Sequence, residues 1–299
     1  MDSCGAGKIR CRKWWPDGNV RAVVQLVHGI AEHVERYDQF ASFLTDNGFL
    51  VVAEDHMGHG RSIGSDQPKG YFYGGWFQAV DDTYQLLTMI KESMPGVPYI
   101  IFGHSMGSFM ARTLIEKYPD CGINACVLCG TGWMPESVLS IGKLTAKLIC
   151  KVKGETAPSS FMQKMMFGAY NSRIENARTQ YDWLTRDNKI VDAYQSDELC
   201  GFDVTGGLSR DLLTGMKFIQ KTENLKKMNK QLPVLFIAGG DDPVGNYGKG
   251  VIKTADMFEK NGMRNICVKL YPLCRHEILN EINAQEVYCD IIHWIDNMI

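Results

Sequence analysis

Short apolar runs alternate with segments of helical periodicity along most of the chain, and this alternation restricts the fold more than any other feature of the sequence. The apolar runs are residues 22–28, 49–55, 99–104, 125–130, 233–240 and 265–271. Runs of this length that are apolar throughout are typical of parallel strands buried on both faces. The segments between them, such as 35–48 and 105–119, place apolar residues three and four positions apart, as helices that cover a sheet do. The sequence therefore predicts an α/β fold with a mostly parallel sheet flanked by helices.

The alternation stops after Gly130 and resumes at residue 233. A gap of this length is too long for an unstructured connection within a compact domain, so we predict an inserted helical subdomain. The predicted division is a first part of the core at 1–131, a helical cap at 132–231 and a second part of the core at 232–299. An insertion at this point would lie over the strand ends where sheets of this type bind ligands.

The composition limits the classes of partner and of compartment. The chain of 299 residues has a formal net charge of -2 and no long block of Lys and Arg, so we expect no nucleic-acid partner. The first residues lack the apolar core of a signal peptide, and no stretch of about 18 residues is apolar throughout, so we expect a cytoplasmic protein. The ten cysteines are irregularly spaced, which favours reduced thiols over a disulfide framework.

Two pairs of residues have a spacing that metal ligands also use. Cys126 and Cys129 form a Cys-x-x-Cys pair, but they belong to a predicted buried strand, and we interpret them as core residues. His56 and His59 lie in a glycine-containing turn after a predicted strand, and the sequence indicates no third ligand for them. We therefore predict no metal site.

Ser105 lies in the sequence Gly-His-Ser-Met-Gly, between a predicted buried strand and a predicted helix. A serine in this setting is typical of a nucleophile elbow, because Gly103 and Gly107 remove side chains that would collide in the tight turn. The helix that follows directs its amide-bearing end toward the reaction centre. The alternative is that Ser105 only caps the helix at 106–118 and that the glycines only permit a turn.

A serine nucleophile needs a base and a carboxylate that orients the base, and the sequence supplies both in the order Ser, Asp, His. His276 follows a predicted strand and precedes a predicted helix, where its imidazole can reach Ser105. The carboxylate is either Asp241 or Asp242, which follow the fifth predicted strand. We favour Asp242, because the Pro243 after it fixes the turn that leaves this position, and we interpret Asp241 as a turn or capping residue.

The tetrahedral intermediate of acyl transfer also needs hydrogen-bond donors for its negatively charged oxygen. One is the backbone N–H of Met106, the residue after the nucleophile. The other is the N–H of Ile30, because Gly29 lets the loop after the first predicted strand turn toward the site. The alternative for His28 and Gly29 is a simple turn at the end of the strand. Because amides stabilise the charge in this arrangement, we predict no cofactor.

Four strings form a specific set that is spread over nearly the whole chain. They are HGIAEHVERYDQFASFLTDNGFLVVAEDHMGHGRS at 28–62, GHSMGS at 103–108, GGDDPV at 239–244 and YPLCRHEILNE at 271–281. Together they resemble the monoacylglycerol lipase and bacterial lysophospholipase group of α/β-hydrolases, and the cap segment 183–202 is similar to the bacterial members. The resemblance implies an α/β-hydrolase fold and the following roles: nucleophile Ser105, base His276, acid Asp242, and oxyanion donors Ile30 and Met106.

The resemblance further implies a serine hydrolase that cleaves carboxylic esters, with a monoacylglycerol or a lysophospholipid as the substrate. The alternatives among enzymes are a short-chain carboxylesterase and an aminopeptidase-like hydrolase. The alternative from another class is a ligand-binding protein without turnover. A complete set of Ser, Asp and His in the hydrolase order argues against that last alternative.

The predicted cap is rich in large apolar side chains, so we expect it to form a pocket for one acyl chain. These side chains are Trp133, Met134, Phe161, Met162, Met165, Met166 and Phe167. The helix expected near 136–153 carries two different faces, an apolar stripe of Val138, Ile141, Leu144, Leu148 and Val152, and a basic face of Lys143, Lys147 and Lys151. We expect the basic face to contact lipid surfaces transiently. The alternative is that the apolar side chains only pack the cap and that the lysines form a solvated face.

Overall fold

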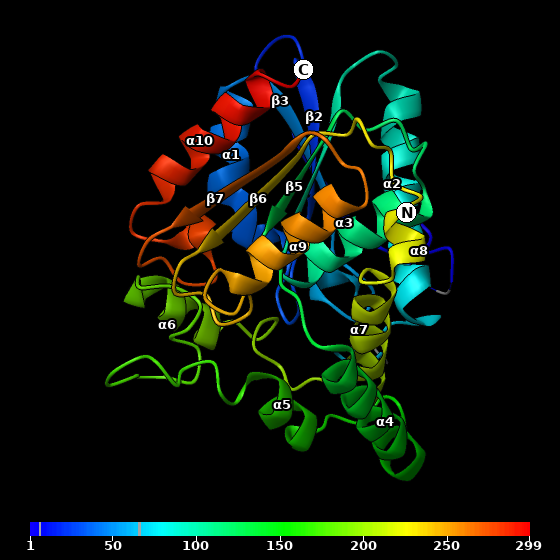
Figure 1. The fold of residues 1–299 in the computed structure, drawn as a ribbon, viewed down its shortest axis with the longest axis vertical. Coiled ribbons are helices and arrows are strands. Elements are labelled where there is room, and N and C mark those ends of the chain that lie inside the picture. The colour runs from blue at the N-terminus through cyan, green and yellow to red at the C-terminus, as the bar shows by residue number, and fades with distance from the viewer. Residues whose placement is uncertain (6, 65–66) are drawn as a thin grey trace.

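Among the described residues, 1–5, 7–64 and 67–299, seven strands form one sheet in the order β1-β3-β2-β4-β5-β6-β7 (Figure 1). The structure is a computed structural model. The strands are β1 (Cys11–Trp14), β2 (Ala22–Val27), β3 (Phe49–Glu54), β4 (Tyr99–His104), β5 (Ala125–Cys129), β6 (Val234–Gly239) and β7 (Ile266–Tyr271). β1 runs antiparallel to β3, and the other neighbouring pairs are parallel. The mostly parallel sheet is therefore confirmed, whereas β1 was missed because two of its four residues are charged.

Helices cover both faces of the sheet (Figure 1). One face is covered by α1 (Asp38–Asp46) and α10 (Ala284–Asp296), and the other by α2 (Gly75–Ser93), α3 (Met106–Lys117) and α9 (Lys249–Lys260). Side chains alternate between these faces along each strand, as strand geometry requires. In β2, Val24 and Leu26 join the core under α1, whereas Val23 and Val27 join the core under α3. Burial on both faces explains why the predicted strands β2 to β6 are mostly apolar, whereas the predicted edge strand β7 is half exposed.

The insertion between β5 and β6 is helical. It contains α4 (Glu136–Lys153), α5 (Ser160–Phe167), α6 (Asn188–Ser196), α7 (Gly206–Phe218) and α8 (Thr222–Leu225). Figure 1 shows α4, α5 and α6 beyond the carboxyl ends of the strands, and α7 leads back to the helices of the core. A Cβ on Gly215 of α7 would lie 2.0 Å from the indole ring of Trp76 in α2, so the two helices pack in direct contact. We use the name cap for this insertion.

The apolar stripe of α4 faces outward. Its buried side instead consists of Leu139, Gly142 and Ala146, and α4 contacts α7. The stripe residues are exposed by 50 to 81%, and they are Val138, Ile141, Leu144, Leu148 and Val152. Within the part of the chain that the structure describes, no helix is both long enough and apolar enough to cross a bilayer.

The parallel strands direct four loops to one edge of the sheet. Ser105 follows β4, Ile30 lies in the loop after β2, Asp242 lies in the loop after β6, and His276 lies in the loop after β7. The carboxyl ends of parallel neighbours meet at the same edge, which is the edge that the cap covers. The sheet topology therefore brings residues from distant parts of the chain to a common place.

Candidate active site

Ser105 lies in a strained turn between β4 and α3. Its φ of 52° and ψ of -120° are unfavourable for a residue with a side chain, so the surrounding contacts must hold it. A Cβ on Gly103 would lie 2.4 Å from the Gly107 carbonyl oxygen, and a Cβ on Gly107 would lie 1.9 Å from the Val27 carbonyl oxygen. The Ser105 N–H donates to the Cys129 carbonyl oxygen at 2.9 Å, which ties the turn to β5. This geometry is that of a nucleophile elbow.

His276 and Asp242 form a buried hydrogen bond where β6 and β7 end. His276 Nδ1 lies 3.0 Å from Asp242 Oδ2. The other carboxylate oxygen of Asp242 accepts a hydrogen bond from the Val244 N–H at 2.8 Å. Asp241 is exposed and lines a separate cavity together with Arg173. Of the two neighbouring aspartates, Asp242 is thus the one that contacts the imidazole.

A cavity of about 430 Å³ is lined by both Ser105 and His276. Gly29 and Ile30 line it as well, and a Cβ on Gly29 would lie 3.1 Å from the Ser105 Cβ, so the loop after β2 packs directly on the serine. Polar side chains of the cap complete its wall, namely Ser160, Gln163, Lys164, Asn171, Gln180, Tyr181 and Asp203. We call this cavity the polar chamber.

A second cavity, of about 280 Å³, is lined almost entirely by apolar side chains. We call it the apolar pocket. It shares Ile30, Ser105, Phe167 and Trp183 with the polar chamber. Most of the rest of its lining comes from α3, α4, α5 and α7, and the loop before α4 adds Met134. The helical residues include Met106, Phe109, Val138, Ile141, Met165, Met166, Leu212, Leu213 and Met216. Ser105 therefore lies where an apolar and a polar cavity meet.

The apolar side chains expected to line an acyl pocket divide into two groups. Met134, Met165, Met166 and Phe167 do line the apolar pocket. The remaining three lie elsewhere: Met162 is buried in the core, Phe161 is 62% exposed, and the ring of Trp133 lies 3.3 Å from Lys253 Nζ.

Ile30 lines the same cavity as Ser105, and Met106 follows Ser105 directly in the chain. Met106 is the first residue of α3, so its N–H has no partner within the helix. Within the described residues, neither N–H donates to a protein acceptor. Ala31, which follows Ile30, has a φ of 54°, and its carbonyl accepts hydrogen bonds from the Tyr194 hydroxyl and the Gly201 N–H, each at 2.9 Å. The cap thus holds the loop that carries Ile30.

A buried ionic network, whose residues were not predicted to have a role, lies beside this loop. Glu32 Oε1 accepts a hydrogen bond from the Gly29 N–H at 2.6 Å. Arg36 donates to Glu32 at 2.7 Å and to both carboxylate oxygens of Glu277 at 2.7 Å. Burial disfavours the charge of Arg36, but Glu277 and Glu32 hold its pKa well above the ordinary value. The pair of Glu32 and Arg36 could have been predicted from the sequence, because residues four positions apart lie one helical turn apart and can form an ion pair.

Three buried histidines pack beside the same loop. The ring centroids of His28 and His56 are 4.0 Å apart, and those of His28 and His59 are 5.5 Å apart. His28 Nε2 accepts a hydrogen bond from the His56 N–H at 3.0 Å, and His28 Nδ1 lies 2.7 Å from the Gly29 carbonyl oxygen. Burial lowers the pKa of His56 to about 3 and that of His59 to about 4. These neutral imidazoles support the backbone of the loop.

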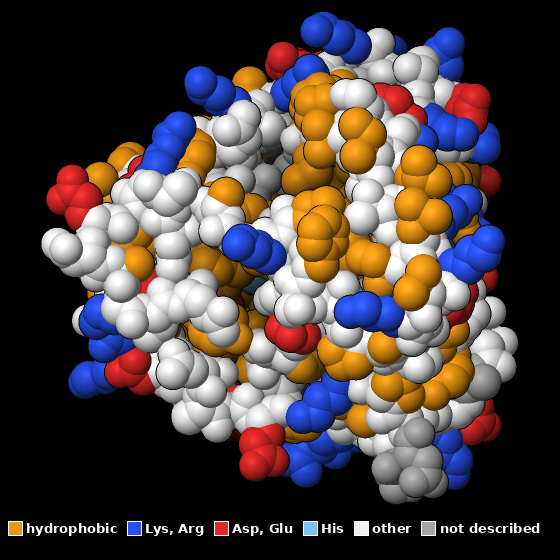
Figure 2. Space-filling view, turned by 90° about the horizontal axis from the view of Figure 1, so that it is seen from below, with side chains coloured by type: hydrophobic (Ala, Val, Ile, Leu, Met, Phe, Trp, Pro, Cys, Tyr) orange, Lys and Arg blue, Asp and Glu red, His pale blue; other side chains and the backbone are white. Residues whose placement is uncertain are grey.

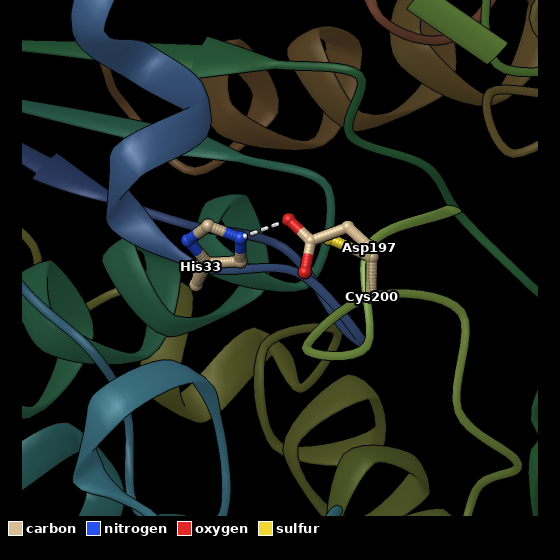
Figure 3. A group of neighbouring side chains, drawn as sticks. All are labelled: His33, Asp197 and Cys200. Carbon is tan, nitrogen blue, oxygen red and sulfur yellow. Dashed lines mark hydrogen bonds and ion pairs between the residues drawn. The ribbon is translucent and has the colours of Figure 1, made fainter. Parts of the chain in front are cut away.

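Figure 3 shows His33, Asp197 and Cys200, whose potential ligand atoms all lie within 4.8 Å of one another. His33 Nε2 and Asp197 Oδ2 are 2.8 Å apart, which is a hydrogen-bond distance. Tetrahedral zinc with bonds of about 2 Å would separate two such ligands by roughly 3.3 Å. We therefore interpret this group as a polar contact that joins the loop after β2 to the end of α6.

Cys126 and Cys129 lie on β5 with free, fully buried thiols. Burial raises the pKa of both thiols, which disfavours thiolate chemistry. Cys126 joins the core on the α3 side of the sheet and Cys129 joins the core on the α1 side. A spacing of three residues on a strand thus directs the two thiols to opposite faces.

Comparison with known proteins gives consistent results. Residues 18–283 match the family described as serine aminopeptidase, S33. The chain is 30% identical over 295 residues to a monoacylglycerol lipase of Mycolicibacterium smegmatis, covering 97% of this chain and 94% of the relative. It is 28% identical over 290 residues to the monoglyceride lipase of Homo sapiens, covering 91% of this chain and 84% of the relative.

Solved structures with the same fold include esterases and lipases. A thermostable carboxyl esterase from Bacillus coagulans, in complex with glycerol, superposes with a TM-score of 0.92 at 29% identity, covering 100% of this chain and 97% of that chain. A lipase in its open form superposes with a TM-score of 0.85 at 26% identity, again covering 100% of this chain and 97% of the other.

Proposed function

Because the chain belongs to the α/β-hydrolase family described as serine aminopeptidase, S33, we propose that it is a serine hydrolase that cleaves carboxylic esters of lipids with one acyl chain. The similar proteins include lipases and a carboxyl esterase, which supports ester hydrolysis over peptide hydrolysis. The observation that carries the substrate class is the meeting of an apolar pocket and a polar chamber at Ser105.

In the proposed reaction, Ser105 Oγ attacks the ester carbonyl carbon while His276 Nε2 takes the hydroxyl proton. Asp242 accepts the hydrogen bond from His276 Nδ1, which keeps Nε2 in the form that acts as a base. The N–H groups of Ile30 and Met106 stabilise the oxyanion. The alcohol then leaves with the proton from His276, and water releases the carboxylic acid through the same steps with the base activating the water.

The apolar pocket takes the acyl chain in this proposal. Each methylene group that leaves water for such a pocket contributes about 0.8 kcal/mol to binding. The pocket has a volume of about 280 Å³ and opens at Ser105, so the specificity constant rises with chain length until the pocket is full. A short-chain esterase would gain nothing from a pocket of this kind.

The polar chamber takes the alcohol. Its Gln163, Asn171 and Gln180 side chains both donate and accept hydrogen bonds, which suits the hydroxyl groups of glycerol. Two carboxylates of the chamber, Glu32 and Glu277, are paired with Arg36. A phosphate would approach these carboxylates, and a peptide amino terminus would compete with Arg36 for them, so this part of the chamber favours a monoacylglycerol. The wall that the cap forms also carries Lys164 and Asp203, so the comparison of head groups decides the preference.

The outward face of α4 brings the enzyme to lipid surfaces in this proposal. Its exposed apolar stripe lies beside Lys143, Lys147 and Lys151, and Figure 2 shows apolar side chains gathered among Lys and Arg on the cap face. Apolar side chains insert at the membrane interface and lysines attract anionic head groups. Val138 and Ile141 of the stripe also line the apolar pocket, so a lipid has a short path from the surface to Ser105.

The test measures kcat/KM for p-nitrophenyl esters from acetyl to palmitoyl, and then compares a monoacylglycerol, a lysophosphatidylcholine and an aminoacyl p-nitroanilide. We expect a rise to a medium or long acyl chain and a preference for the monoacylglycerol. A maximum at acetyl or butyryl would instead identify a short-chain esterase. Faster turnover of the anilide would favour an aminopeptidase, and binding without turnover of any ester would favour a ligand-binding protein.

A further inference from the structure

Two different loops supply the groups that the proposed reaction uses around Ser105. The loop after β2 carries the Ile30 N–H, and the loop after β7 carries His276. The amide must face the oxyanion and the imidazole must face the serine hydroxyl at the same moment. The relative position of the two loops therefore matters to the transition state more than the position of either loop alone.

The side chain of Arg36 connects these two loops directly. Its Nη1 donates to Glu32 Oε2 and to Glu277 Oε1, and its Nη2 donates to Glu277 Oε2, each at 2.7 Å. The three side chains are 11, 4 and 4% exposed, so water competes little for these contacts. A planar guanidinium with its donors in a fixed fork holds two carboxylates at a defined angle, which an ammonium group cannot do.

Each end of this connection lies close to a group that the proposed reaction uses. Glu277 follows His276 in the chain, and its N–H donates to the Leu184 carbonyl oxygen at 2.7 Å. Glu32 accepts the Gly29 N–H at 2.6 Å, and Gly29 precedes Ile30. Glu32 also accepts a hydrogen bond from the Tyr37 hydroxyl at 2.9 Å, which fixes its carboxylate further.

The cap closes over the same connection. The guanidinium carbon of Arg36 lies 4.7 Å from the ring centroid of Tyr194 in α6, and the Tyr194 hydroxyl donates to the Ala31 carbonyl. The polar contact between His33 and Asp197 joins the same loop to the end of α6 (Figure 3). The loop after β2 is thus held from the cap side and, through Arg36, from the His276 side.

We infer that Arg36 and Glu277 are positioning residues for ester hydrolysis. Their ion pair fixes the position of the Ile30 N–H relative to the His276 imidazole. This inference rests on the proposed function. Neither residue takes part in bond making. Binding of the acyl chain in the apolar pocket does not require this relative position, so its loss lowers kcat and the affinity for a transition-state analogue by a larger factor than it changes KM.

The experiment compares Arg36→Lys, Glu277→Gln and their double variant with the wild-type enzyme. Arg36→Lys keeps the positive charge but loses the fork, and Glu277→Gln keeps the shape but loses the charge. The matched control is Arg186→Lys, because Arg186 also pairs with a buried carboxylate near the β7 loop, that of Glu281 at 2.8 Å. Readouts are kcat and KM for a p-nitrophenyl ester, inhibition by an alkyl trifluoromethyl ketone, binding of an unreactive ether analogue, and Tm.

We expect each single variant to lower kcat by about 10²-fold, the loss typical of a misplacement of roughly 1 Å. Inhibition by the trifluoromethyl ketone, which forms a tetrahedral adduct with the serine, is expected to weaken by a similar factor, whereas KM and the affinity for the ether analogue change by a much smaller factor. The kcat of the double variant is expected to be no lower than that of the less active single variant, because the two residues act as one unit. Arg186→Lys keeps wild-type kcat. Glu277→Asp, which keeps the charge, recovers part of the loss and serves as the second variant if Glu277→Gln does not fold.

Wild-type kcat in Arg36→Lys and Glu277→Gln would overturn the inference and leave the proposed function standing. A loss confined to KM, a loss that Arg186→Lys shares, or additive losses in the double variant would also overturn it, since each indicates a merely structural effect. If the wild-type enzyme itself turned over no ester, the proposed function would fall, and the inference with it.

Discussion

His276 Nδ1 lies 3.0 Å from Asp242 Oδ2 although the two residues are 34 positions apart in the chain, with α9 and β7 between them. The contact arises because β6 and β7 are parallel neighbours whose last residues, Gly239 and Tyr271, are aligned in the sheet. The loops that follow both strands therefore leave the sheet at the same edge, and each needs only a few residues to bring its side chain to the other.

Ser105→Ala is expected to lower ester turnover by about 10³-fold or more, because the nucleophile of the proposed reaction is lost. Tm is expected to stay close to wild type, since the hydroxyl group borders a cavity and the Cβ remains. Turnover of a p-nitrophenyl ester and a thermal melt check both parts. Retention of most of the activity would refute the assignment of Ser105.

Asp242→Asn is expected to reduce kcat by about 10⁴-fold, because the amide no longer holds the His276 tautomer that the base requires. Asp241→Asn is the matched control: the same chemical change one residue earlier, on an exposed side chain that lines a different cavity. Steady-state kinetics of both variants on one ester decide between them. The opposite ranking would assign the acid to Asp241.

Ester turnover is expected to survive dialysis against EDTA, because the proposed mechanism assigns charge stabilisation to the N–H groups of Ile30 and Met106. The rate before and after dialysis is measured on the same ester. Loss of activity on dialysis, with recovery on addition of zinc, would contradict the amide assignment and require a metal in the reaction.

The double variant Leu144→Ser/Leu148→Ser is expected to weaken binding to vesicles that contain anionic lipid by about tenfold or more, since burial of one leucine contributes about 1.5–3 kcal/mol. Both residues lie on the exposed stripe of α4, at 60 and 57% exposure. Turnover of a soluble short ester should not change. Ile252→Ser on α9, an exposed position at 47%, serves as the control. Equal binding by all three proteins would exclude α4 as the lipid-contacting face.

Glu54→Gln is expected to flatten the pH dependence of stability between pH 6.5 and pH 8. Burial raises the pKa of Glu54 to about 8, above its ordinary value of 4.5, so in this range the native state binds a proton that the unfolded state has lost. The contribution of this carboxyl to the free energy of unfolding is therefore largest below pH 4.5. It falls between pH 4.5 and about pH 8, by up to about 1.4 kcal/mol per pH unit. Urea denaturation at several pH values measures the slope, with exposed Glu92→Gln as control. An unchanged slope in Glu54→Gln would contradict the raised pKa.

The features that could be predicted from the sequence are those that a short segment determines. The five inner strands, β2 to β6, are buried on both faces, so the apolar run of each is visible in isolation, and the elbow at Ser105 depends on two glycines within four residues of each other. β1 was invisible because it is a half-exposed edge strand with charged residues. A local pattern therefore sufficed where burial made the pattern uniform, and also for the half-exposed edge strand β7, which has one charged residue against two in β1.

The features that could not be predicted depend on contacts between distant segments. The apolar stripe of α4 is a regular helical face, but whether it faces α7 or solvent is decided by the small residues Gly142 and Ala146, which permit closer packing on the opposite side. Arg36 and Glu277 are 241 residues apart, and no periodicity relates them. The sequence supplies both charges, and only the sheet topology brings them together.

The place of the cap in the chain also has a consequence for biosynthesis. Cys126 of β5 pairs with Val234 of β6, so these neighbouring strands emerge from the ribosome about a hundred residues apart, a delay of roughly 5 to 20 seconds at usual elongation rates. During that interval the nascent sheet already contains Ser105 but ends in β5, an apolar strand whose outer edge has unpaired hydrogen-bonding groups and is prone to aggregation. A chain truncated within the cap would keep this open edge of β5 permanently. We therefore expect the nascent chain to depend most on chaperones while the cap is being translated.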